Sequence, residues 1–166
     1  MKILESELRR AGLDVAGAFD VGRWDENFVH GGRDGCLGVV IGNSKALWPV
    51  FLASARSESD PLDRYVERAV LGATARAAQR WGCESVVHWG HTAPAIPIQR
   101  IAEVAGVARL GPAYLSIHPE HGPWFGLRAL AVFDVPAPQE VVTAPDLCSG
   151  CAGRPCVPAM EAAISL

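Results

Sequence analysis

The sequence predicts a layered α/β domain with a mixed, largely antiparallel sheet flanked by helices. Helix-like and strand-like segments alternate along the chain, which is typical of sheets covered by helices. The last two strand-like runs, Ala113–His118 and Trp124–Val135, are separated by only a few residues. Such a short connection favours an antiparallel pair, because parallel strands need a long crossover. With 166 residues and 49% hydrophobic residues, the chain can bury the core of one domain.

The first elements follow from apolar periodicity and from glycine positions. Residues 2–12 predict a short amphipathic helix with Ile3, Leu4 and Leu8 on one face, and Leu13–Val21 predicts a strand. The polar, glycine-rich stretch at 22–35 predicts a loop. Cys36–Ile41 is a continuous apolar run bounded by glycines, which is typical of a strand buried on both faces.

Helix start and stop signals organise the middle of the chain. A turn at 42–45 predicts a helix that continues to about Ala55. Asp60-Pro61 is a stronger start signal, and Gly82 is a stop signal, so a long helix is expected to end at about Trp81. Glu84–Trp89 predicts a second buried strand, and Pro97–Val107 predicts a helix.

The chain divides into two parts by composition. Residues 1–135 contain the expected helices and strands and form the predicted α/β domain. Residues 136–166 contain a proline-rich connector, a cysteine cluster and a short closing helix. We therefore expect one folded domain followed by a cysteine-bearing tail.

Charge and cysteine content narrow the classes of function. A net charge of −3 argues against nucleic acid as the main partner, because phosphate binding needs a basic face. No apolar run is long enough to cross a membrane, and the N-terminal residues mix acids and bases, so the cytoplasm is the expected compartment. Five cysteines, an odd number with three crowded together, favour metal, iron–sulfur or redox chemistry in a reducing compartment.

The segment Ser116–Arg128 has the densest collection of functional groups. It contains two histidines, one tryptophan, one phenylalanine, two glycines and one arginine besides its serine. Trp124, Phe125 and Leu127 can form the apolar wall of a pocket, and Arg128 can hold an anion through two parallel hydrogen bonds. The alternative is that these residues form the core of a strand pair and that His118-Pro119 is its turn.

Several motifs in this half of the chain resemble those of the CblC-type cobalamin-processing proteins. The resemblance depends on Gln99 with Ile101–Gly106, on Ile117-His-Pro, and on Gly122, Trp124-Phe125 and Leu127-Arg128. Leu37–Val40 and Asp60–Asp63 add a weaker similarity in the same order. The family implies a nitroreductase-like (flavin-reductase-like) fold that holds a corrin in place of a flavin.

The resemblance also implies which residues hold the corrinoid. Position by position, the corrin-contacting residues of the family correspond to Ile96, Pro97, Ile98, Gln99, Ser116 and Leu127, and Arg128 corresponds to an arginine near the upper ligand. His118, Gly122, Trp124 and Phe125 complete the candidate cofactor-binding set. The family binds cobalamin without a protein ligand to cobalt, so His118 and His121 are not assigned as axial ligands.

The tail carries Cys148, Cys151 and Cys156 as candidate metal ligands. Their spacing resembles the cluster loops of bacterial ferredoxins and of epoxyqueuosine reductase, which implies a 4Fe–4S cluster. A structural zinc site and a loop with bare thiols are the alternatives. A fourth ligand would have to come from Cys36, Cys83, a partner chain or a non-protein group. Cys36 and Cys83 are themselves expected to be buried and inert.

The resulting hypothesis is a cytoplasmic corrinoid-binding protein. It would reduce a cobalamin-type cofactor, remove its upper ligand or pass it on, with an iron–sulfur cluster as a candidate electron donor. Further candidate partners are an electron-donor protein and a second copy of the chain. The alternatives are a flavin-dependent reductase of the same fold and a non-catalytic metal-binding or interaction domain.

Overall fold

The apolar run that begins at Cys36 forms β2 (Cys36–Asn43), the most deeply buried strand of a four-stranded sheet. All eight β2 residues are buried. In this computed structural model, which describes residues 1–24, 35–54, 56–90 and 96–164, β2 lies between β1 (Val15–Asp20) and β6 (Gly126–Pro136). The edge strand β3 (Ser85–Trp89) pairs with β6 and gives the order β1-β2-β6-β3, with every pairing antiparallel. The predicted α/β fold with a largely antiparallel sheet is confirmed.

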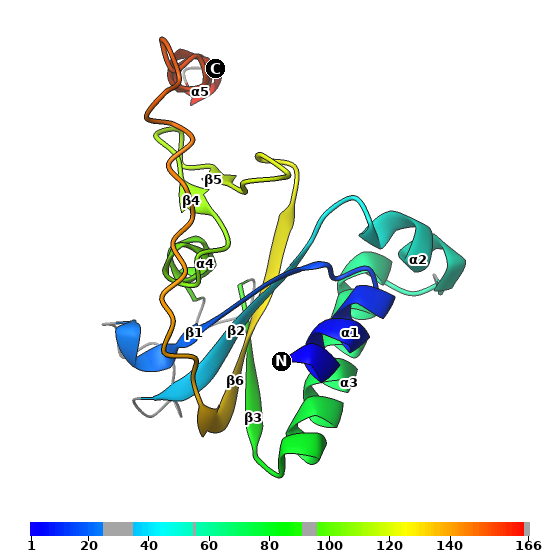
Figure 1. Cartoon of the computed structure of the whole chain (residues 1–166). Coiled ribbons are helices and arrows are strands. Elements are labelled where there is room, and N and C mark those ends of the chain that lie inside the picture. The colour runs from blue at the N-terminus through cyan, green and yellow to red at the C-terminus, as the bar shows by residue number, and fades with distance from the viewer. Residues whose placement is uncertain (25–34, 55, 91–95, 165–166) are drawn as a thin grey trace.

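One face of the sheet is covered by α1 (Lys2–Arg10), α2 (Leu47–Ser54) and α3 (Pro61–Trp81) (Figure 1). Leu4 and Leu8 of α1 are fully buried there, as predicted, whereas Ile3, which was expected on the same face, is 37% exposed. Burying this apolar face contributes most of the favourable free energy of folding. The first core cluster joins these helices to the sheet through Leu37, Val39, Ile41, Ala129, Ala131 and Phe133.

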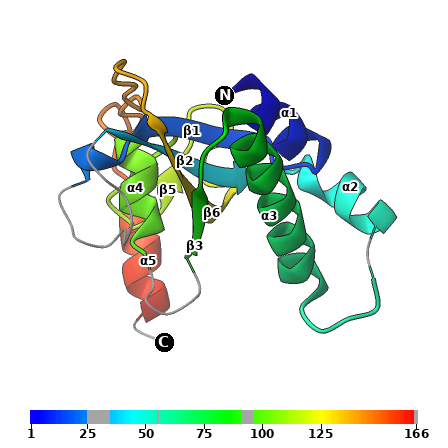
Figure 2. The same cartoon turned by 90° about the horizontal axis from the view of Figure 1, so that it is seen from below.

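The opposite face is covered by α4 (Ile98–Val104), so the sheet lies between two helical layers (Figure 2). The second core cluster includes Val40, Leu130 and Val132 from the sheet and Ile101 and Ala102 from α4. Because both faces are covered, the central strands are apolar throughout instead of alternating with polar residues. The short 3₁₀ helix η1 (Val21–Arg23) follows β1.

The boundaries of α3 match the prediction from its flanking residues. Pro61 is its first residue, and Gly82 follows its last residue in the left-handed conformation, at φ +68°. Glycine adopts this conformation without the steric cost that a Cβ atom brings. The predicted helix at 97–107 is shorter than expected and ends at Val104. Most of the predicted loop at 22–35, and Ala55, lie outside the described residues.

The predicted pairing of Ala113–His118 with Trp124–Val135 is wrong. The first run contributes only β5 (Ser116–Ile117), which pairs with β4 (Arg109–Leu110) in a separate two-stranded sheet. A tight turn explains this, because the Gly111 amide donates to the Leu115 carbonyl at 2.8 Å and closes the chain locally. The second run contributes β6, whose buried residues fill the centre of the main sheet. The strand at Glu84–Trp89 was predicted to be buried, but it is an edge strand with Val86 48% exposed.

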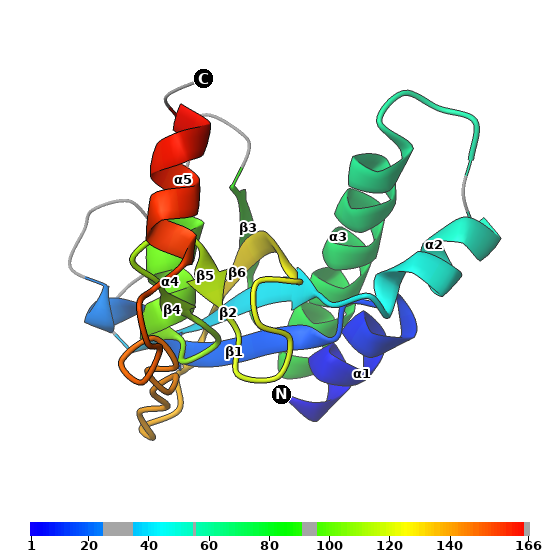
Figure 3. The same ribbon diagram turned by 90° about the horizontal axis from the view of Figure 1, so that it is seen from above.

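The chain ends in a tail that leaves the sheet domain. A connector after β6 leads past the β4–β5 hairpin to α5 (Cys156–Ile164), which has no buried residue. Figure 3 shows α5 rising on the α4 side of the molecule, away from α1, α2 and α3. The boundary that we place after residue 135 stays a prediction. Among the described residues, no helix combines the length and apolarity that membrane crossing requires.

Candidate functional site

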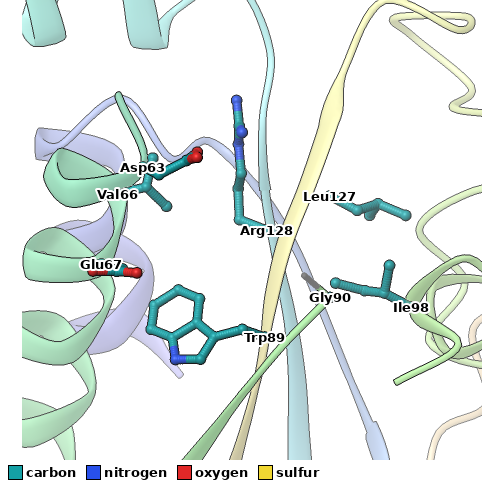
Figure 4. Close-up of a pocket in the computed structure, with 8 residues that line it drawn as sticks. All are labelled: Asp63, Val66, Glu67, Trp89, Gly90, Ile98, Leu127 and Arg128. Carbon is teal, nitrogen blue, oxygen red and sulfur yellow. The ribbon is translucent and has the colours of Figure 1, made fainter. Parts of the chain in front are cut away.

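The candidate site lies where the edge strand β3 stops and β6 continues. β3 pairs with β6 only from Ala129 to Phe133, so Gly126–Arg128 extend past its end. A cavity of about 310 Å³ opens at this point, between α3 and α4 (Figure 4). We call it the Arg128 cavity. Its lining residues are Asp63, Val66, Glu67, Trp89, Gly90, Ile98, Leu127 and Arg128.

A β-bulge in β6 decides which side chains face this cavity. Ile41 of β2 lies opposite Ala129, but the next residue, Gly42, lies opposite Leu127. Arg128 is therefore the extra residue of the bulge, and the alternation of side chains along β6 is reset there. Leu127 packs with the second core cluster on the α4 side. Arg128 points into the space next to α3, where Asp63 lies (Figure 4).

Two glycines make the bulge possible. An added Cβ at Gly42 would lie 2.5 Å from the carbonyl oxygen of Gly126, a distance that side chains essentially never adopt. A Cβ at Gly126 would lie 3.3 Å from the central guanidinium carbon of Arg128 and 3.2 Å from Asn43 Oδ1. The strands approach closely and Arg128 has room because both positions lack a side chain.

Arg128 is held by a buried amide. Its Nε donates to Asn43 Oδ1 at 2.7 Å, and Asn43 Nδ2 donates to the carbonyl of Ser44 at 2.9 Å. Burial lowers the pKa of Arg128, and the charge of Asp63 acts in the opposite direction. The guanidinium stays protonated even so, because arginine is not deprotonated in proteins. No ion pair of Arg128 is found among the described residues, and its positive charge faces a cavity in which the charge of Asp63 partly offsets it.

The α3 wall of the cavity is acidic. Asp63 and Glu67 are four residues apart and therefore lie on the same helix face, with Val66 between them (Figure 4). Glu67 also forms an ion pair with Arg64 at 3.0 Å. The opposite wall is apolar, with Ile98 and Leu127. The cavity thus combines a fixed cation, two hydrogen-bond-accepting carboxylates and an apolar side.

Three of the residues that the sequence assigned to the cofactor meet at this cavity: Ile98, Leu127 and Arg128. Ile96 is buried in the second core cluster, and Pro97 precedes the first turn of α4. Gln99 is exposed, and its Nε2 donates to the Tyr114 carbonyl at 3.1 Å, which ties α4 to the β4–β5 turn. Ser116 is buried there, and its Oγ has no hydrogen-bond partner among the described residues. These four residues do not line the Arg128 cavity.

The loop between β5 and β6 is shaped by its histidines. The rings of His118 and His121 stack with centroids 4.5 Å apart, and His118 Nδ1 accepts the backbone N–H groups of Glu120 and His121 at 3.1 and 3.3 Å. Burial lowers the pKa of His118, as does the charge of His121, which favours the neutral ring that can accept these bonds. Gly122 closes the loop at φ +58°. These contacts agree with the interpretation of the histidines as shape-determining residues.

The two aromatic residues of this loop lie outside the Arg128 cavity. Trp124 is 84% exposed. Phe125 packs against His118, with ring centroids 5.4 Å apart, and also against the second core cluster. His118 lines a different cavity of about 360 Å³, next to β1 and the connector. The proposed role of Trp124 and Phe125 as pocket walls therefore stays a prediction.

Sequence reasoning missed four polar or aromatic residues of the cavity region: Asn43, Asp63, Glu67 and Trp89. Asp63 was named only as part of the weaker family similarity at Asp60–Asp63, with no role at a site. Asn43 ends a strand otherwise free of polar side chains, which is the one local signal that marked it. The remaining two gave no local signal, because only the tertiary fold brings them to the cavity.

The candidate metal ligands are not gathered into a site. Cys148 is half-buried, and Cys151 and Cys156 are exposed. No three His, Cys, Asp or Glu side chains in the described part of the chain are placed to hold a metal ion. Cys36 is buried beside Asp134 and Cys83 lies after α3, so neither supplies a further ligand to the tail cysteines. A 4Fe–4S or zinc ligand set at these cysteines is therefore not shown by the described residues, and it stays a prediction.

Comparison with known proteins identifies the fold. No family model and no curated protein matches this sequence. The structure of a B12-trafficking CblC protein from C. elegans superposes with a TM-score of 0.69 at 17% identity, over 87% of this chain and 73% of that one. The chain shares the CblC fold. The fold implied by the sequence motifs is thereby confirmed.

Two larger proteins contain the CblC fold as well. An epoxyqueuosine reductase gives a TM-score of 0.62 at 12% identity, over 90% of this chain and 49% of that one. A reductive dehalogenase whose structure suggests a mechanism for B12-dependent dehalogenation gives a TM-score of 0.51 at 15% identity. This match covers 91% of this chain and 22% of the dehalogenase. The chain thus spans about half of the reductase and about a fifth of the dehalogenase. At these identities the similarity establishes the fold alone.

Proposed function

We propose that the chain binds a cobalamin-type corrinoid at the Arg128 cavity, and that it reduces the corrinoid, removes its upper ligand or passes it on. The main support is the meeting of Ile98 from α4 with Leu127 and Arg128 from β6 at one cavity, since all three residues were assigned to a corrinoid by motif. The shared fold of a B12-trafficking protein and a B12-dependent dehalogenase adds to this support.

The chemistry of the lining fits one part of a corrinoid. A corrin is a broad apolar plate with an amide rim, so it needs aliphatic or aromatic contacts and groups that accept amide N–H bonds. The apolar contacts would come from Ile98, Leu127 and Trp89. The groups that accept amide N–H bonds would be the carboxylates of Asp63 and Glu67. A volume of about 310 Å³ is near the lower limit for small-molecule pockets. The cavity would therefore enclose an edge or the upper-ligand side of the corrinoid, and the remainder would lie outside.

Arg128 is proposed to hold an anionic group at the upper-ligand side. Asn43 occupies its Nε, which leaves both terminal nitrogens to face a ligand. Two parallel N–H groups match a carboxylate or phosphate geometrically and electrostatically. The bound corrinoid would supply a cobalt ion that accepts electrons and carries the upper ligand. The protein groups would orient it and exclude water from one side.

The electrons are proposed to come from an external donor. The tail cysteines would have to wrap a cluster for the chain to carry its own iron–sulfur donor, and no such group of ligands is assembled among the described residues. An electron-donor protein or a small reductant remains the candidate source. This part of the proposal is tested by reduction assays with each kind of donor.

The binding proposal is tested by titrating purified protein with hydroxocobalamin and following the corrin absorption bands. We expect a saturable band shift at one equivalent. Arg128→Gln should weaken binding by about 10- to 100-fold, because hydrogen bonds to a charged group contribute about 1.5–3 kcal/mol. Arg9→Gln, the same change on the exposed surface of α1, should bind like wild type. A wild-type titration without any band shift would overturn the proposal.

The same protein preparation separates the alternatives. Titration with flavin mononucleotide should leave the flavin spectrum unchanged. A flavin shift together with an unshifted corrin spectrum would favour the flavin-dependent reductase. Stoichiometric zinc without any bound cofactor would favour a metal-binding or interaction domain instead.

A further inference from the structure

The tail loop from Asp146 to Cys151 has a defined geometry although it lies outside the sheet domain. Asp146 Oδ1 accepts the backbone N–H groups of Cys148 and Ser149, each at 3.0 Å. Ser149 Oγ donates to the Asp146 carbonyl, also at 3.0 Å. Asp146 Oδ2 lies 3.6 Å from the guanidinium of Arg109, which anchors the loop to β4. The side chains of Cys148 and Cys151 are therefore presented by an ordered turn.

This turn brings the two cysteines within disulfide range. The Cys151 N–H donates to the Cys148 carbonyl at 3.2 Å, so the four residues form a β-turn. The first and fourth α-carbons of a β-turn lie within about 7 Å of each other. A disulfide usually needs an α-carbon separation of about 4.4–6.8 Å. The bond can thus form with little rearrangement of the backbone.

The two thiols differ in access. Cys151 is exposed, whereas Cys148 is half-buried against the β4–β5 turn. A Cβ added at Gly111 would lie 3.4 Å from Cys148 Sγ, which shows how closely this sulfur packs on the hairpin. Exposure favours attack by Cys151 on an external reagent, and the packed Cys148 is in place to react second. In the described part of the chain, no third His, Cys, Asp or Glu side chain is placed with this pair to hold a metal ion.

We propose that Cys148 and Cys151 form a reversible dithiol–disulfide couple that exchanges with small disulfides and dithiols. The Cys151 thiolate attacks one sulfur of a small disulfide, forms a mixed disulfide and releases one small thiol. The Cys148 thiolate then attacks the Cys151 sulfur and releases the second thiol. The pair loses two electrons and two protons, and the small disulfide gains them. This couple needs no corrinoid, so it stands independently of the proposed function.

The couple is tested by equilibrating the full chain, without corrinoid and with a metal chelator, against mixtures of oxidised and reduced glutathione. Free thiols are then blocked with an alkylating reagent and counted by mass spectrometry. Wild type should lose two alkylation sites in one two-electron transition. Cys156→Ser should keep this transition, whereas Cys148→Ser should lose it and retain glutathione on Cys151.

Cys151→Ser should also lose the transition, and Cys148 in this variant should take up glutathione more slowly than Cys151 does in Cys148→Ser, because Cys148 is half-buried. Melting temperatures equal to that of wild type show that these variants fold. The proposal is overturned if the transition disappears in Cys156→Ser, or if wild type keeps both alkylation sites under fully oxidising conditions.

Discussion

The central strand β2 and the terminal helix α5 differ most in how far their side chains are buried. Every residue of β2 is buried, and no residue of α5 is. Packing on two faces therefore determines which side chains β2 can carry, while folding places almost no constraint on α5. In the sheet domain, functional side chains are thus expected where the regular strand pairing is broken, such as at the bulge at Arg128. In the tail, packing does not restrict where functional side chains such as the cysteines occur.

The largest expected effect is that of removing a core aromatic ring. Phe133 is fully buried and packs edge-to-face on Trp81 with centroids 4.9 Å apart. Phe133→Ala should lower the free energy of unfolding by about 3–5 kcal/mol, because it removes apolar contacts and leaves a cavity. Urea unfolding measures this. Ile164→Ala in the tail, where the side chain is 77% exposed, should change it by less than about 0.5 kcal/mol.

Gly42→Ala should have the next largest effect. The new methyl group would meet the backbone of Gly126, which cannot move without displacing the bulge, so a loss of about 1–3 kcal/mol is expected. Gly150→Ala is the matched change in the tail, where an added Cβ meets nothing within 4 Å. It should be neutral or slightly stabilising. Equal melting temperatures for the two variants would contradict the close approach of β2 and β6.

Asp14→Asn should reveal a smaller, pH-dependent contribution. Burial raises the pKa of Asp14, but hydrogen bonds from the Ser44 hydroxyl at 2.6 Å and amide at 2.7 Å outweigh it, so the net shift is downward from 3.8. A carboxyl group with a depressed folded-state pKa stabilises the fold above its unfolded pKa, and this stabilisation is lost as the pH falls through the folded value.

Wild type should therefore be more stable than Asp14→Asn by about 1 kcal/mol at pH 7, a modest value because the carboxylate is only half-buried. The difference should begin to shrink as the pH falls to about 4, near the unfolded-state pKa, and should be lost as the pH falls further through the lower folded-state pKa. Urea unfolding of both proteins across this range is the measurement. A difference that is constant with pH would show that the carboxylate charge contributes nothing.

The smallest expected effect is that of deleting α5. A chain that ends at Pro155 loses no buried side chain, so its free energy of unfolding should stay within about 0.5 kcal/mol of the full-length value. Thermal unfolding of both chains checks this. A large loss of stability would show that α5 packs on the sheet domain in solution, and the contrast between β2 and α5 would then fail.

Local signals in the sequence predict much of the fold. Asp60-Pro61 and Gly82 mark both ends of α3, and the apolar run from Cys36 marks a strand covered on both faces. The pairing of β5 with β6 could not be judged in this way. A hydrogen-bonded turn at Gly111 gives β5 a nearer partner, and that partner is too short to show a strand pattern.

The site was only partly accessible to sequence reasoning for a related reason. Motif resemblance pointed to Ile98, Leu127 and Arg128, but the direction in which Arg128 points depends on a bulge. The register of that bulge is set by the approach of Gly42 to Gly126, two residues that are distant in sequence. The acidic wall at Asp63 reaches the cavity only because α3 packs on the sheet. Such nonlocal contacts leave no periodic trace in the chain.

The pairing of β2 with β6 has a consequence for how the protein is made. These central strands come from early and late parts of the sheet domain, so neither core cluster can close until β6 has been synthesised. Until then a nascent chain exposes the apolar β2 and its unpaired edge, which makes it prone to aggregation. High sequence separation between paired strands also slows refolding. We therefore expect folding to begin only after most of the chain has left the ribosome, and chaperones to bind it before that point.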